Sequence, residues 1–223
     1  MDKHVEQAVV AALEQFEKIA SYPVASFENK IRSVFDSSED FMAKAALLDQ
    51  AFDDEPHLEA LREVFFDLLM VNFFAEDVGK LEEDYLESEE WEAIEEKTID
   101  RGTELLNVIL YLRECRDEDI DPELEDFLKE FLLVDEDEFQ DEYRIYEDVI
   151  ANQVLMESNI EEIARVAKQL PESSEFKELF YPVMGFFLQT SPTEAQKEQY
   201  ISHSNDPEFD AAVYALLVAF NQA

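Results

Sequence analysis

The residues with the clearest chemical potential are carboxylates spaced three positions apart in the middle of the chain. Glu92 and Glu95 form one pair, and Glu114 and Asp117 form a second. Residues three apart lie on the same face of a helix, so each pair can present two carboxylates together. Carboxylate oxygens are the hard ligands that Mg²⁺ prefers. Four of them around one ion would support phosphate chemistry.

The order of these pairs resembles the Glu-x-x-Glu … Glu-x-x-Asp signature of the all-α nucleotide pyrophosphatases. The resemblance covers residues 92–117 only. It implies a Mg²⁺-dependent hydrolase in which four carboxylates hold the metal on a triphosphate: Glu92, Glu95, Glu114 and Asp117.

The helix expected over 89–116 bears on this metal site. Trp91, Leu105, Ile109 and Leu112 favour one long helix. In such a helix Glu92 and Glu114 lie about 33 Å apart and cannot share an ion. Only a break near Gly102 would bring the two pairs together, and the sequence leaves both arrangements open.

Histidine and cysteine give no further catalytic signal. None of the three histidines lies in a Glu-x-x-His motif, which a di-iron bundle requires. Cys115 is flanked by Glu114, Arg116 and Asp117, and nearby acids disfavour a reactive thiolate. We therefore expect no cofactor, with Mg²⁺ as the alternative, and a protein that is not an enzyme.

The strongest feature is an excess of acid in the middle of the chain. The chain has 56 acidic and 17 basic residues, a formal net charge of −39. The segment 76–148 holds 30 of the acids and only 7 of the bases. Its densest cluster interleaves with aromatic residues, as expected of a surface that steers and then anchors a basic protein. The predicted partner-binding residues are Asp135, Glu136, Asp137, Glu138, Asp141, Glu142, Tyr143 and Tyr146. The alternative is a solvated face that only keeps the protein in solution.

Charge and composition also restrict partners and location. So large a negative charge repels nucleic acids and anionic membranes, and we expect neither as a partner. A lone cysteine, no signal-peptide pattern and no long apolar run predict a cytoplasmic protein. The oligomeric state cannot be read from these features.

Nearly every segment shows helical spacing of apolar residues. Val5, Val9 and Phe16 mark a first helix, and the apolar residues between 58 and 74 predict a central buried helix after Pro56. Three glycines in 223 residues disfavour phosphate-binding loops and tight hairpins. We expect one all-α domain over 1–223, an irregular array or bundle of about ten helices, with a degenerate α-solenoid of helical hairpins as the alternative. One expected helix covers 138–157.

These features predict a non-enzymatic interaction or regulatory protein, of the immunity or inhibitor kind. Its acidic middle segment would dock a basic protein partner. The alternative is the Mg²⁺-dependent pyrophosphatase described above.

Overall fold

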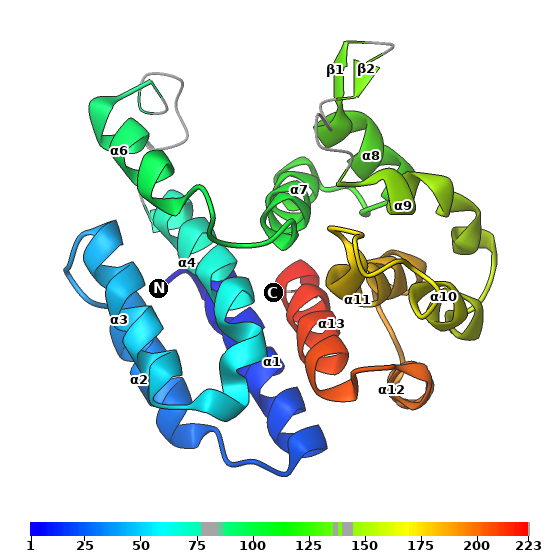
Figure 1. Cartoon of the computed structure of the whole chain (residues 1–223), viewed down its shortest axis with the longest axis horizontal. Coiled ribbons are helices and arrows are strands. Elements are labelled where there is room, and N and C mark those ends of the chain that lie inside the picture. Colours follow the sequence, from blue (N-terminus) through cyan, green and yellow to red (C-terminus); the bar gives the residue numbers. More distant parts are fainter. Residues whose placement is uncertain (77–84, 86, 136–137, 140–144, 223) are drawn as a thin grey trace.

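The protein is an all-α array of helices around one continuous apolar core, as expected from its sequence (Figure 1). The computed structural model describes residues 1–76, 85, 87–135, 138–139 and 145–222. Within these residues it contains twelve α-helices, two 3₁₀-helices and one two-stranded antiparallel hairpin.

The first part of the chain forms a group of helices around the long buried helix α4. In chain order, its elements are α1 (Lys3–Ala20), α2 (Ala25–Phe35), α3 (Phe41–Asp53), η1 (Pro56–Leu61) and α4 (Arg62–Glu76). Helix α4 is buried over most of its circumference because its residues are almost all apolar. This agrees with the central position that its sequence indicates.

The second part of the chain contains the remaining helices and the hairpin. In order, its elements are α6 (Glu89–Thr98), α7 (Leu105–Glu118), α8 (Leu124–Leu132), β1 (Leu133–Asp135), β2 (Glu138–Phe139), α9 (Glu147–Ala151), η3 (Gln153–Glu157), α10 (Ile160–Ala167), α11 (Lys177–Leu188), α12 (Glu194–His203) and α13 (Pro207–Gln222). In the hairpin, Leu133 pairs with Phe139 and Asp135 with Glu138.

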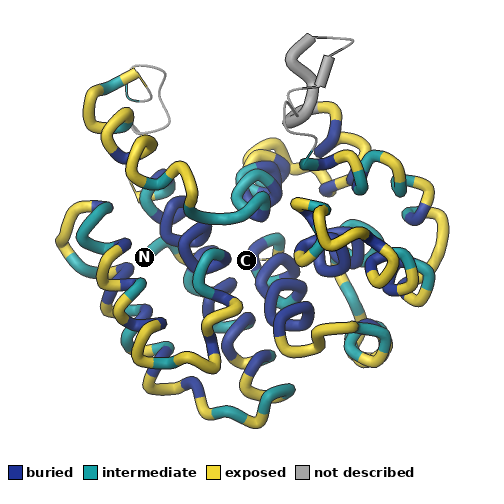
Figure 2. Tube along the Cα trace, in the orientation of Figure 1, coloured by how far each residue is buried: buried dark blue, intermediate teal, exposed yellow. Residues whose placement is uncertain are grey.

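Helices α1 and α13 make the most extensive helix–helix contact among the described elements. Val5, Val9 and Phe16 form the buried stripe of α1, and their spacing follows the helical period. In a solenoid each repeat contacts only its neighbours. Packing of the first helix against α13 therefore favours the irregular array over the solenoid, and Figure 2 shows the buried residues of both helices at the centre.

The expected single helix over 89–116 is wrong. The chain forms α6 and α7, separated at Gly102, which has a φ of +83°. This left-handed conformation is open to glycine at little cost and ends a right-handed helix. Helical spacing of apolar residues continues across the break, so spacing alone could not reveal it.

The expected helix over 138–157 is also wrong. The structure places a strand at 138–139, the short helix α9 and the 3₁₀-helix η3 in this stretch. Residues 137 and 141, and likewise 138 and 142, are all acidic. Like charges one helical turn apart destabilise a helix, which opposes continuous helix here.

A buried carboxyl group lies in the first turn of α13. Asp210 is 5% exposed, accepts a hydrogen bond from the Ser204 hydroxyl at 2.5 Å, and lies beside a stack of tyrosines. Burial raises its pKa to about 6, although the hydrogen bond from Ser204 opposes the shift. The stacked rings of Tyr181, Tyr200 and Tyr214 have centroids 4.5 and 4.1 Å apart.

Candidate functional site

Helix α6 is the most acidic helix that the structure describes. The Ser88 hydroxyl caps it by accepting the Trp91 N–H at 3.1 Å, and Ile94 is its one buried residue. Five exposed glutamates on this helix form no ion pair within the described residues: Glu89, Glu90, Glu92, Glu95 and Glu96. Helix α6 therefore presents uncompensated negative charge to solvent.

A second group of exposed acids follows the end of α7. Arg116 pairs with Asp117 at 3.7 Å, and Lys129 pairs with Glu125 at 2.6 Å. The other exposed acids here have no ion-pair partner among the described residues: Glu114, Glu118, Asp119, Asp121 and Glu123. In the view of Figure 1, α6 lies at the upper left and α8 at the upper right, with α7 between them.

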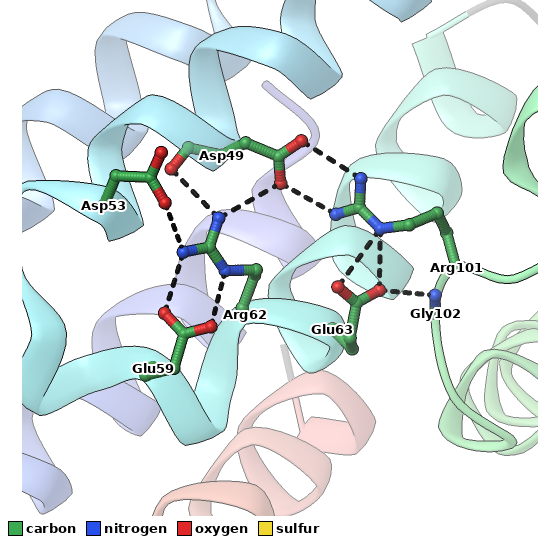
Figure 3. A network of polar contacts seen from close by, with 7 residues as sticks. All are labelled: Asp49, Asp53, Glu59, Arg62, Glu63, Arg101 and Gly102. Atoms are coloured by element: carbon green, nitrogen blue, oxygen red, sulfur yellow. Dashed lines mark hydrogen bonds and ion pairs between the residues drawn. The ribbon is translucent and has the colours of Figure 1, made fainter.

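A network of two arginines fixes the end of α6 to the N-terminal helices (Figure 3). Arg101 donates to both carboxylate oxygens of Glu63 at 3.0 and 3.1 Å and to those of Asp49 at 2.8 and 3.1 Å. Its guanidinium lies 4.5 Å from the ring centroid of Phe66. Arg62 continues the network by donating to Asp49 as well. Such multidentate geometry suits arginine and restrains the connection to α7.

The start of α7 is fixed by a buried carboxyl group. Asp67, 1% exposed on α4, accepts the Thr103 backbone N–H at 2.9 Å and also the Thr103 hydroxyl. Burial raises the pKa of the Asp67 carboxyl well above its usual range, while the hydrogen bonds from Thr103 oppose the shift. The backbone N–H of Gly102 donates to Glu63 at 2.7 Å. The break between α6 and α7 is thus held by three backbone and side-chain donors.

A cleft of about 450 Å³ opens between α4, α6 and α7. Its α4 side is formed by Phe66, Met70 and Phe74, which are four residues apart and so lie on one face. These three side chains belong to the apolar core. The cleft therefore opens onto core side chains.

The other two walls of the cleft show the same helical spacing. Trp91, Glu95 and Ile99 line it from α6, and Leu106 and Leu110 line it from α7. Trp91 and both leucines are half-buried, whereas Ile99 is 78% exposed. Residues at four-residue spacing on three helices thus line one cleft, whose lining is mainly apolar. Sequence reasoning did not find this cleft, although each stripe has the four-residue spacing that could have indicated it.

The residues predicted to bind a partner fall mainly outside the described residues. These are Glu136, Asp137, Asp141, Glu142 and Tyr143. Asp135 and Glu138 lie in the hairpin, in β1 and β2.

Tyr146 is described, and it is a core residue. It is 3% exposed and donates its hydroxyl to Glu104 at 2.6 Å. Its ring packs against Phe127 and Phe176. Tyr146 is therefore not an exposed anchor for a partner, because its ring packs against other aromatic side chains of the core.

The four carboxylates of the predicted metal site do not converge. Glu92 and Glu95 are exposed on α6, while Glu114 and Asp117 are exposed near the end of α7. The break at Gly102 exists, yet these four do not form a group able to hold a metal ion, and no other such group occurs among the described residues. The two carboxylate pairs arise because α6 and the end of α7 each carry several exposed acidic residues.

The chain has no match in three comparisons: no family model, no curated protein and no solved structure is similar to it. Among the helices that the structure describes, none is long and apolar enough to cross a lipid bilayer.

Proposed function

We propose that this protein is an interaction protein whose acidic middle segment docks a basic protein partner. The observation that carries the proposal is the set of exposed, unpaired carboxylates on α6 and around the end of α7. Folded proteins commonly intersperse charges of both signs on their surface. Here the acids outnumber nearby cations, and two of those cations are already paired: Arg101 with Asp49 and Glu63, and Lys129 with Glu125.

Such a surface acts mainly on encounter with the partner. Clustered charge raises the association rate of an oppositely charged protein and excludes like-charged ones. The same acids repel each other, so a basic partner would relieve that repulsion on binding. The acidic cluster 135–142, predicted from the sequence, would extend this surface along the chain.

Affinity capture with the full chain as bait, at about 50 mM and about 500 mM salt, tests the proposal because salt screens exposed charges. We expect a basic protein that is retained at low salt and released at high salt. The retained protein is then purified and its affinity is measured directly. A second bait carries lysine in place of the six acids of the predicted cluster: Asp135, Glu136, Asp137, Glu138, Asp141 and Glu142.

Two outcomes would refute this function. One is a bait that retains no basic protein at low salt. The other is a lysine-substituted bait that binds the purified partner as tightly as the parent chain. No observation on the described residues favours the alternative role as a hydrolase.

A further inference from the structure

We propose that the cleft between α4, α6 and α7 binds a basic amphipathic helix of the partner protein. The inference rests on the proposed function and deepens it by naming the shape of the segment that docks. It follows from three observations: the cleft's helical stripes, its apolar lining and the charge along its edge.

The shape of the cleft suits a helix. The α4 stripe runs from Phe66 to Phe74, eight residue steps or about 12 Å at 1.5 Å per residue. An amphipathic helix places anchors at i, i+3, i+4 and i+7, a length of about 10 Å. The length of the α4 stripe therefore matches about two turns of a docked helix.

The apolar lining of the cleft favours a docked helix with an apolar face. Met70 is one of the residues that line the cleft, and methionine adapts to differently shaped partners. Ile99 exposes 78% of its surface at the end of α6, which leaves a large apolar group in water. Covering Ile99 and the half-buried Trp91 would remove that apolar surface from solvent.

The acidic edge of the cleft favours positive charge on the docked helix, next to its apolar face. Glu95 lines the cleft, Glu92 and Glu96 lie next to it on α6, and Glu114 lies one turn beyond Leu110 on α7. None of these four glutamates has an ion-pair partner among the described residues. Arg101 is the only cation lining the cleft in the described part of the chain, and Asp49 and Glu63 already neutralise it. A helix that carries lysine or arginine beside its apolar face complements this edge.

The cleft contains its own reporter, because Trp91 is the one tryptophan in the sequence. A helix that displaces water from the cleft shifts the emission of Trp91 to shorter wavelength. The probe is a lysine–leucine peptide of about fourteen residues with leucines at i, i+3, i+4 and i+7 spacing. Its control has the same composition in an order that gives no apolar face. Both are titrated into the full chain, with fluorescence anisotropy of a peptide label as an independent measure of binding.

We expect the amphipathic peptide to shift Trp91 emission saturably. The reordered peptide binds the acidic surface by charge, so its anisotropy rises while Trp91 emission stays constant. Ile99→Gln removes an apolar contact without changing charge, and we expect it to weaken the amphipathic peptide about tenfold. Val154→Gln is the matched control, since Val154 is 70% exposed but lies on η3 outside the cleft.

The results separate this inference from the proposed function. If both peptides bind equally and neither shifts Trp91 emission, the cleft is not the docking site while the acidic surface remains one. If neither peptide binds, both proposals fail. An Ile99→Gln chain that binds the amphipathic peptide like the parent overturns the inference. A dimer of this chain that Ile99→Gln abolishes would also overturn the inference, because a second copy of the chain would then fill the cleft.

Discussion

Thr103 donates two hydrogen bonds, from its backbone nitrogen and from its hydroxyl, to the buried carboxyl group of Asp67. These residues lie 36 positions apart and join the start of α7 to the centre of α4. Beside them, a Cβ atom on Gly102 would lie 2.5 Å from Oδ1 of Asp67. The contact therefore holds the connection between α6 and α7 against α4, where Asp67 and Thr103 also line the cleft.

Gly102→Ala should destabilise the protein strongly. The substitution places a side chain at a φ of +83° and against Asp67. We expect a loss of about 2 kcal/mol or more in the free energy of unfolding, measured by urea denaturation. In the double variant with Asp67→Ala the steric conflict is gone, so its loss should be smaller than the sum of the two single losses. Simple additivity, or an unchanged stability of Gly102→Ala, would contradict the close approach.

Arg101→Gln should loosen the connection between α6 and the N-terminal helices. It removes the bonds to Glu63 and Asp49 and the contact with the Phe66 ring. We expect a loss of about 1–2 kcal/mol in unfolding free energy. The control is Arg165→Gln, which removes an exposed pair with Glu162 and should cost less than about 0.5 kcal/mol. Equal losses in the two variants would show that the network contributes no more than a surface pair.

Asp210 should make stability depend on pH in a defined direction. Its pKa in the folded protein is about 6, against an ordinary value of 3.8. As pH falls between these values, the folded state takes up a proton that the unfolded state does not. The parent chain should therefore gain stability relative to Asp210→Asn as pH falls from about 6 to about 4, by up to about 1.4 kcal/mol per pH unit. It should lose that gain as pH rises again.

Urea denaturation of the parent and Asp210→Asn chains at several pH values measures this difference. Glu208→Gln serves as the control, because Glu208 is exposed on the same helix and its substitution leaves Asp210 in place. A stability difference between parent and Asp210→Asn that is the same at every pH would refute the burial of a charged carboxyl group.

Tyr146→Phe separates a core role from a docking role. The hydroxyl of Tyr146 donates to Glu104 and accepts from Asn107 at 2.9 Å. Removing it should lower the unfolding free energy by about 1 kcal/mol. The affinity for the lysine–leucine peptide should not change, because the ring is buried away from solvent. A weaker affinity for the peptide with an unchanged free energy of unfolding would contradict the core role and indicate that Tyr146 contacts the partner.

The helices with regular apolar stripes could be predicted from the sequence. The stripe of Val5, Val9 and Phe16 marks α1, and the apolar run in α4 marks a central helix; both predictions are confirmed. Local spacing decides these elements because burial of one face stabilises them. The all-α class follows from the same reasoning.

The break between α6 and α7 could not be predicted with certainty, because it depends on contacts between distant residues. Glu63 and Asp67 on α4 hold Gly102 and Thr103 in place. A signal was present: Asp67 and Asn72 interrupt an otherwise apolar run, and both prove to be buried with partners, Asn72 accepting the Asp2 N–H at 2.8 Å. A polar residue inside an apolar helix indicates such a partner without naming it.

The central claim is that exposed acids of the middle segment dock a basic chain. Glu89, Glu92 and Glu96 share one face of α6, and none of the three lines the cleft itself. A variant with glutamine at these three positions is compared with a control of equal net charge. In the control, glutamine replaces three exposed acids outside the segment: Glu157, Glu161 and Glu175.

The deciding measurement is the affinity of both variants for an oligolysine at about 50 mM salt, where exposed charges are weakly screened. The account predicts that the α6 variant binds about fivefold to tenfold more weakly than the parent chain, while the control stays within about twofold. Equal affinities in the two variants would contradict it, because binding would then depend on total charge and not on the acids of the middle segment.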